Sequence, residues 1–126
     1  MTGRVWVCVA PVDARKSYDG LAGVITTALG RDPVSGDLYV FRNKRGDRLK
    51  VLAWQGDGFA IYMRRLEAGT FAFPAADTPD VTVTPTQLAM ILGGVELAGT
   101  RTRRRYARPA PGIPSDSRNS PAAAGV

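Results

Sequence analysis

The feature that most constrains this chain is a pair of β-prone runs separated by a short basic turn. The run Leu38–Arg42 precedes the turn, and the run Arg48–Leu52 follows it. Between them, Asn43 stands at the first turn position and Gly46 at the fourth, which favours a type I turn closed by a left-handed glycine. A tighter two-residue turn with Gly46 at its second central position is the less favoured alternative. The segment therefore predicts an antiparallel β-hairpin.

The turn type also predicts which residues lie opposite one another, because hairpin register follows from turn length. The expected pairs are Tyr39 with Val51, Val40 with Lys50, Phe41 with Leu49, Arg42 with Arg48 and Asn43 with Asp47. In this register one face of the hairpin is apolar and belongs to the core. The other face carries the basic residues, which are Arg42, Arg48 and Lys50, with Lys44 and Arg45 at the tip.

This basic face is a candidate nucleic-acid-binding site. Like charges opposite one another on a sheet lower its stability by up to about 1 kcal/mol per pair unless a counter-charge neutralises them. An anionic partner such as DNA removes that repulsion. The alternative is that the basic side chains only keep the hairpin soluble and protect its edge.

Arg15 and Lys16 extend the candidate site towards the next segment. They directly precede a predicted helix, whose positive N-terminal end attracts phosphate groups. The competing interpretation, which we favour for these two residues, is that they form salt bridges with Asp13 or Asp19.

The rest of the sequence predicts two helices and further strands. Five successive apolar residues within residues 4–10 indicate a strand buried on both faces. An amphipathic helix is expected after Ser17, its N-cap, with Gly30 just past its end. A second helix is expected to begin with a capping box formed by Thr84 and Gln87. Strands are also expected at residues 59–66, 70–73 and 81–83. We therefore predict an α+β fold, in which a mainly antiparallel sheet of five to six strands, with the basic hairpin at its centre, packs against two short helices.

Charge divides the chain into two parts. Residues 1–100 contain 11 Lys or Arg and 10 Asp or Glu, whereas residues 101–126 contain six and one. The second segment has almost no large apolar side chains, so it cannot bury enough surface to fold alone. We predict a single domain over residues 1–99 and a disordered basic tail over residues 100–126. The tail is expected either to be merely solvated or to contact phosphates through Arg101, Arg103, Arg104 and Arg105.

Composition disfavours several classes of function. Cys8 is the only cysteine and histidine is absent, which rules out disulfides, Cys/His zinc sites and nucleophile–histidine pairs. Cys8 lies in an apolar run and is expected to be an inert core residue. A metal-dependent nuclease is disfavoured because the carboxylates fall mostly in turns or beside basic residues. We predict no catalytic residues, no metal, no cofactor and no small-molecule ligand.

The sequence also gives an expectation for the location of the protein. It contains no apolar run of membrane-spanning length and no recognisable signal peptide. We therefore expect a cytoplasmic protein without membrane contact.

Several motifs in residues 4–97 follow the order found in one protein family. Residues 13–21 are similar to D-M-R-K-x-F-D-G-L, and residues 32–52 to D-P-x-S-G-x-L-F-V-F-R-N-R-R-G-D-R-L-K-V-L. Arg64–Glu67, Phe71–Pro74 and Thr84–Gly94 follow in the same order. The chain resembles the small TnpB accessory protein, encoded by the second open reading frame, of insertion-sequence-66-type bacterial transposons.

The resemblance implies a process and partners. It implies a bacterial protein that assists transposition of its element, beside a separately encoded transposase and another small protein with a DNA-binding helix-turn-helix. It transfers no catalytic residue. The first hypothesis is a non-catalytic accessory protein that binds transposon DNA through the hairpin, with salt-dependent affinity and little sequence preference. The alternative is a protein-interaction subunit that docks on the transposase without direct DNA contact.

Overall fold

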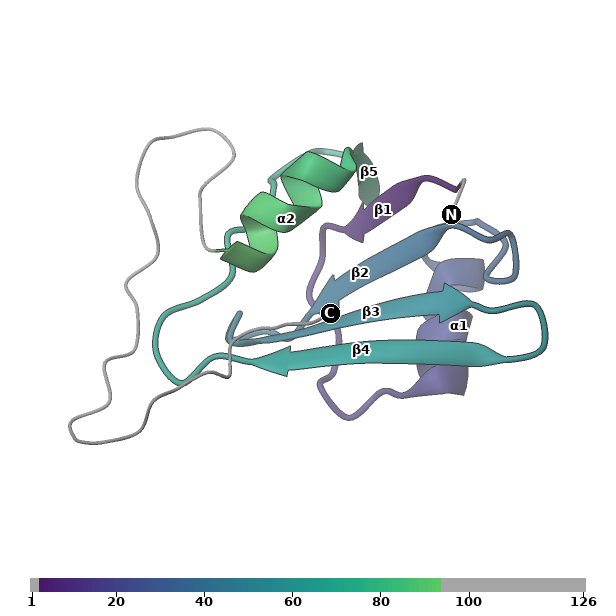
Figure 1. Cartoon of the computed structure of the whole chain (residues 1–126), viewed down its shortest axis with the longest axis horizontal. Coiled ribbons are helices and arrows are strands. Elements are labelled where there is room, and N and C mark those ends of the chain that lie inside the picture. Colours follow the sequence, from purple (N-terminus) through teal and green to yellow (C-terminus); the bar gives the residue numbers. More distant parts are fainter. Residues whose placement is uncertain (1–2, 94–126) are drawn as a thin grey trace.

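A five-stranded sheet organises residues 3–93, the part of the chain that the computed structural model describes (Figure 1). The strands in chain order are β1 (Val5–Cys8), β2 (Leu38–Arg42), β3 (Arg48–Trp54), β4 (Phe59–Arg65) and β5 (Asp80–Val83). Their spatial order is β4-β3-β2-β1-β5. Only the β1–β2 pairing is parallel, and the other three are antiparallel. The predicted α+β class with a mainly antiparallel sheet is confirmed.

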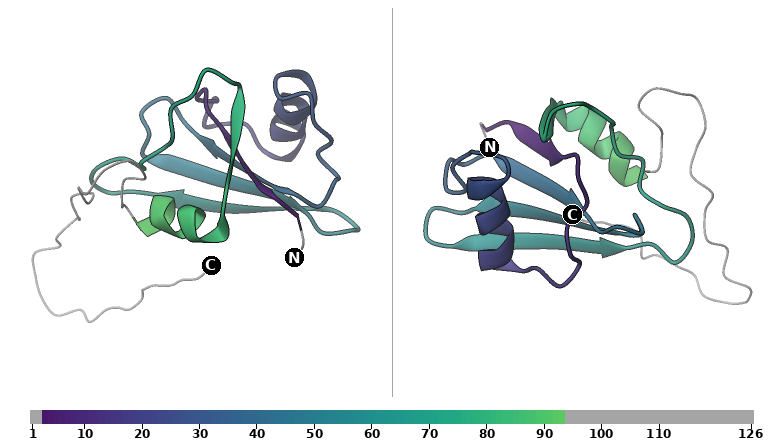
Figure 2. Two further views of the ribbon diagram at one scale, coloured as in Figure 1. Left: turned by 90° about the horizontal axis from the view of Figure 1, so that it is seen from above. Right: turned by 180° about the vertical axis from the view of Figure 1, so that it is seen from behind.

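Two helices cover opposite faces of this sheet (Figure 2). Helix α1 (Tyr18–Thr27) turns Leu21 and Ile25 inwards, and both are fully buried because they lie on the same side of the helix. It ends before Gly30, which has φ 65°, and the Arg31 amide there donates to the Ile25 carbonyl at 2.9 Å. Ser17 occupies the expected N-cap position, but its side chain makes no capping hydrogen bond.

Helix α2 (Pro85–Gly93) begins with the predicted capping box. The Gln87 amide donates to Thr84 Oγ1 at 3.0 Å, and the Thr84 amide donates to Gln87 Oε1 at 2.8 Å. Ile91 is fully buried against the sheet. Neither helix in residues 3–93 is long and apolar enough to cross a membrane.

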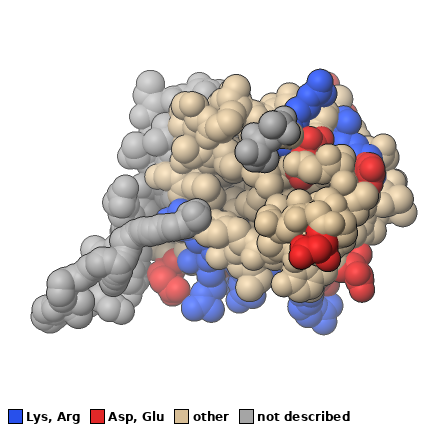
Figure 3. Space-filling view, turned by 45° about the vertical axis from the view of Figure 1, so that its right-hand side comes forward, with Lys and Arg blue, Asp and Glu red and all other residues tan. Residues whose placement is uncertain are grey.

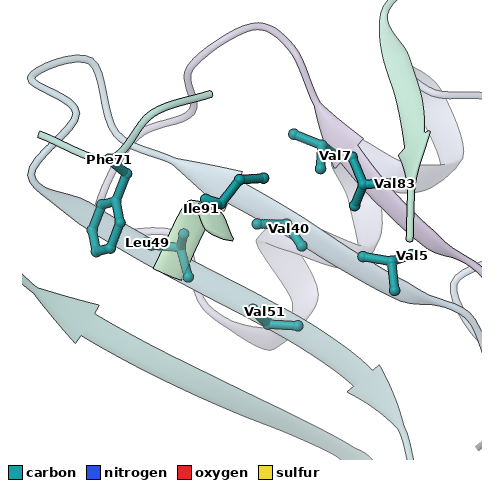
Figure 4. Close-up of a cluster of buried hydrophobic side chains, with 8 residues drawn as sticks. All are labelled: Val5, Val7, Val40, Leu49, Val51, Phe71, Val83 and Ile91. Atoms are coloured by element: carbon teal, nitrogen blue, oxygen red, sulfur yellow. The ribbon is translucent and has the colours of Figure 1, made fainter. Parts of the chain in front are cut away.

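The sheet separates two hydrophobic clusters, one beneath each helix. The cluster on the α2 side is drawn in Figure 4 and consists of Val5, Val7, Val40, Leu49, Val51, Phe71, Val83 and Ile91. The cluster on the α1 side consists of Trp6, Cys8, Leu21, Ile25, Leu29, Tyr39, Phe41 and Leu52. Alternate residues of β1 and β2 enter opposite clusters, so these strands are buried on both faces. Cys8 is buried as predicted, and its burial raises the pKa of its thiol.

The predicted register of the β2–β3 hairpin is wrong by one residue. The structure pairs Tyr39 with Leu52, Val40 with Val51, Phe41 with Lys50 and Arg42 with Leu49. A shift of one residue moves every side chain of one strand to the other face. Leu49 and Val51 therefore pack under α2, on the opposite face from Tyr39 and Phe41.

The turn itself has the expected closing contact, but it contains one more residue. The Gly46 amide donates to the Asn43 carbonyl at 3.1 Å, and Gly46 has φ 79°. Asn43 then pairs with Arg48 instead of Asp47, through its own amide and through its side-chain oxygen, which accepts from the Arg48 amide at 3.0 Å. Asp47 is the additional loop residue, and Asn43 Nδ2 donates to its carboxylate at 2.8 Å. That hydrogen bond is the main cause of the lowered pKa of Asp47.

A distant segment supports the hairpin tip from the side. The Leu66 amide donates to the Asp47 carbonyl and the Phe71 amide to the Gly46 carbonyl, both at 2.8 Å. The strand expected at residues 70–73 is absent from the described sheet, and Phe71 instead inserts its ring into the core. The tip is therefore fixed against this segment and does not project as a free arm.

A partly buried ion pair joins the loop after α1 to β5. Arg31 Nε donates to the carboxylate of Asp80 at 2.6 Å, and the Asp80 side chain is almost inaccessible to solvent. The Arg31 guanidinium stacks over the Trp6 ring, 3.2 Å from its centroid. Trp6 Nε1 in turn donates to Asp37 at 2.9 Å. Each buried polar group in this cluster thus has a partner, as burial requires.

The two glycines Gly46 and Gly23 predict stability changes of opposite sign on replacement by alanine. Gly46→Ala should lower the free energy of unfolding by about 1–2 kcal/mol, because its φ is positive and a Cβ would press on Thr70 at 3.3 Å. Gly23→Ala should raise it by about 0.5–1 kcal/mol, because Gly23 lies within α1 with open space around it. Urea denaturation of both variants measures the two changes. Equal changes would contradict this account of the tip.

Candidate nucleic-acid interface

The observed register distributes the hairpin's basic residues over both faces of the sheet. Arg42 and Arg48, expected to lie opposite each other, are on different faces, as are Arg42 and Lys50. The predicted single basic face, comprising Arg42, Arg48 and Lys50, is therefore wrong. Lys44 and Arg45 are exposed at the tip, as expected.

Arg42 is turned into the protein. Its Nη2 donates to the Val9 carbonyl at 2.9 Å, and its guanidinium lies 5.3 Å from the centroid of the Phe73 ring. Its Nε is buried without a hydrogen-bond partner among the described residues. These contacts tie β2 to the segments after β1 and β4, so the Arg42 guanidinium is engaged within the protein.

Lys50 fastens the loop before α1 onto the sheet. Its ammonium group donates to the Ala14 carbonyl at 2.8 Å and to the Lys16 carbonyl. Charge-assisted hydrogen bonds of this kind are stronger than neutral ones. Lys50 therefore positions residues 14–16 beside the hairpin, and one of its three N–H donors remains for another partner.

Arg15 forms the salt bridge that competed with phosphate binding. Its Nη2 and Nε contact the two carboxylate oxygens of Asp13 at 2.9 and 3.2 Å, and its amide also donates to that carboxylate at 2.8 Å. The side-chain hydrogen bond from Arg15 is the main reason that the pKa of Asp13 falls to about 2. Lys16 is exposed beside this pair, with its stem against Gly20.

The structure instead brings Arg48 together with a residue that was not predicted as part of the site. Arg48 on β3 and Arg65 on β4 are direct cross-strand partners, and both are exposed. Direct cross-strand neighbours have Cβ atoms about 4.5–5.5 Å apart, so the two positive charges share one small area. Glu67 contacts Arg65 Nη2 at 3.2 Å and offsets part of this charge.

These two arginines border a shallow groove of about 480 Å³. We call it the basic groove, and its lining residues are Ala14, Arg48, Leu49, Lys50, Met63, Arg64, Arg65 and Glu67. Arg64 lies at its far side, on the α2 face, where its Nη1 donates to the Leu92 carbonyl at 2.8 Å. Figure 3 shows basic side chains gathered along the lower margin of the molecule, on the side of β4, with acidic ones among them.

The tight turn between β3 and β4 is the sequence signal that indicates the position of Arg65. A two-residue turn between Gln55 and Gly58 places Arg65 opposite Arg48 when the register is followed along the two strands. The Gln55 amide donates to the Gly58 carbonyl at 2.7 Å, which shows that this turn is formed. The sequence places Arg64 and Arg65 in the strand expected at residues 59–66 and in a family motif, but does not mark them as site residues.

Three carboxylates near the candidate site are engaged in local contacts. Asp13 binds Arg15, Asp47 binds Asn43, and Glu67 binds Arg65. Within residues 3–93, no three side chains of the metal-ligating types come together. The predicted tail contacts Arg101, Arg103, Arg104 and Arg105 lie outside the described residues.

Comparisons with known proteins identify the family. The family described as IS66 Orf2 like protein matches residues 3–102. The uncharacterized protein y4jC of Sinorhizobium fredii is 35% identical over 102 residues, which cover 81% of this chain and 86% of that protein. The uncharacterized protein y4hO of the same organism is 33% identical over 93 residues, covering 74% and 81%. No solved structure matches the chain significantly.

The fold and the site together define a small α+β protein with a shallow basic groove. The chain belongs to the IS66 Orf2 like family. This membership gives it an accessory role in transposition and an association with the transposition machinery. The resemblance stated from the sequence motifs is confirmed.

The Asp13–Arg15 pair predicts a measurable titration. NMR titration of the side-chain carboxyl of Asp13 should give a pKa of about 2, and Arg15→Ala should return it towards the ordinary 3.8. Because the folded pKa is lowered, the stabilisation from this pair is present above about pH 4 and is lost as pH falls towards 2. Lys16→Ala is the control, since Lys16 contributes least to the shift. An Asp13 pKa unchanged in Arg15→Ala would contradict the pairing.

Proposed function

We propose that the protein is a non-catalytic accessory subunit that binds transposon DNA along the basic groove and the adjacent hairpin tip. The residues assigned to phosphate contact are Arg48 and Arg65, with Lys44, Arg45 and Lys16 at the margins. Arg42 and Arg15 are left out because internal partners occupy them. Lys50 supports the surface from below through its bonds to the loop before α1.

The observation that carries this proposal is the Arg48–Arg65 pair. Two exposed arginines stand directly opposite on adjacent strands, and Glu67 is the only acidic residue that lines the described groove. Like charges opposite one another lower stability by tenths of a kcal/mol up to about 1. A phosphate bound between the two guanidinium groups replaces this repulsion with attraction, because each arginine binds phosphate through paired N–H donors.

The anchored hairpin tip determines how the protein can contact DNA. Backbone bonds from Leu66 and Phe71 hold Asp47 and Gly46 against the protein body, so the hairpin does not enter a groove of DNA as a free arm. The basic residues instead present a surface that lies along the phosphate backbone. Such contacts position a protein without reading bases, and the affinity they give falls steeply with salt.

Fluorescence anisotropy with labelled element-end and random duplexes, measured across a salt series, tests the proposal. We expect similar affinity for both duplexes. Arg48→Gln and Arg65→Gln together should weaken binding and reduce the slope of log K against log salt by about 1.8, since each lost phosphate contact removes about 0.9. Circular dichroism checks that this double variant remains folded.

Two control variants of the full chain make this result specific. Arg4→Gln removes one exposed charge directly before β1 and should leave the slope unchanged. A variant with glutamine at Arg101, Arg103, Arg104 and Arg105 measures the share of the C-terminal arginines. Binding that is lost in this variant and retained in the Arg48/Arg65 variant would overturn the groove assignment. No DNA binding by the wild type would favour docking on the transposase instead.

A further inference from the structure

The outer edge of β4 is a seven-residue strand edge without a partner among the described residues. β4 lies at the end of the sheet and pairs only with β3 within residues 3–93. Its register is continuous over Phe59–Arg65, so no bulge interrupts it. Natural edge strands are usually protected by a bulge, a proline or an inward-facing charge. The first five residues of β4, Phe59–Met63, contain none of these.

The hydrogen-bond pattern shows which backbone groups this edge offers. Gln55 bonds with Gly58, and Leu66 bonds with Asp47, across the β3–β4 pair. Because hydrogen-bonded and non-hydrogen-bonded pairs alternate along an antiparallel ladder, residues 60, 62 and 64 bond to β3. Residues 59, 61, 63 and 65 therefore direct their N–H and C=O groups outwards. Met63, one of these four, is 65% exposed, the highest among the exposed large apolar side chains.

From this edge we infer that β4 pairs with β4 of a second copy of this chain in an antiparallel, twofold-symmetric dimer. Tyr62 is the central residue of Phe59–Arg65, and an antiparallel pairing centred on it overlaps all seven residues. It also makes hydrogen-bonded partners of residues whose backbone groups face outwards, namely 61 with 63 and 59 with 65. This register is selected because it overlaps all seven residues and pairs the residues whose backbone groups face outwards.

The side chains of β4 are self-complementary in this register. Met63 lies beside Ile61 of the second copy, which covers an exposed apolar side chain. Tyr62 stands opposite its own counterpart, an aromatic cross-strand pair of the kind that stabilises sheets. Arg64 faces Ala60 and Arg65 faces Phe59, so no two positive charges oppose each other, whereas pairing centred on either arginine would place them together.

The dimer also aligns the basic grooves. Adjacent antiparallel strands related by a twofold axis keep equivalent side chains on the same face of the joined sheet, so both Arg48–Arg65 pairs lie on one side. The two copies of Arg65 are offset by six residues, or about 20 Å along the strands. The inference does not depend on the proposed DNA binding, and its test uses no DNA.

Sedimentation velocity of the full chain over a range of concentrations tests the dimer. We expect wild-type protein to dimerise reversibly. Met63→Lys should weaken dimerisation roughly tenfold or more, because it removes two symmetric apolar contacts and adds a charge to the edge. Val34→Lys is the matched control, since Val34 is 45% exposed in the turn segment before β2, away from β4. A monomer at all concentrations, or a dimer unaffected by Met63→Lys, would overturn the inference.

Disulfide trapping tests the register independently. Tyr62→Cys places two thiols opposite each other at the twofold axis, and mild oxidation should cross-link the dimer. Ala60→Cys should not cross-link, because its two copies are offset by four residues, about 13 Å along the strands. Cys8 is buried and does not interfere. Cross-linking of Ala60→Cys with none of Tyr62→Cys would exclude the register centred on Tyr62.

Discussion

The register between β2 and β3 is the constraint on which the rest of the structure depends. It is fixed where Asn43 binds both Asp47 and the Arg48 amide, and where the Leu66 and Phe71 amides close on the same turn. Together these bonds accommodate one additional loop residue. Because side chains alternate along a strand, that residue decides which apolar groups meet α1 and which meet α2.

The same register determines what the charged residues do. It sends Arg42 inwards to the Val9 carbonyl and holds Lys50 under the loop before α1. Arg48 is left exposed, and the tight turn after β3 brings Arg65 next to it. Charges that look equivalent along the sequence thus divide into groups that stabilise the fold and groups that face solvent. The proposed phosphate contacts belong to the second group.

The proposed DNA surface and the proposed dimer edge meet on β4. Arg65 borders the basic groove, whereas the backbone of the same strand presents the unpaired edge. The groove uses the Arg65 side chain, whereas the proposed dimer uses the outward main-chain groups of β4 together with the side chains of Ile61, Tyr62 and Met63. Met63 borders both surfaces. Both surfaces suit an accessory protein that works within a larger transposition assembly.

The sequence by itself determined the features that depend on nearby residues. It predicted the α+β class, the Thr84–Gln87 capping box, the left-handed Gly46 and the buried Cys8, because short-range hydrogen bonds and apolar runs control them. It did not predict the register, the absence of a strand at residues 70–73, or the role of Arg42. Only the tertiary structure decided these, because they also depend on carbonyls and amides supplied by segments distant in the sequence, such as the Val9 carbonyl and the Phe71 amide.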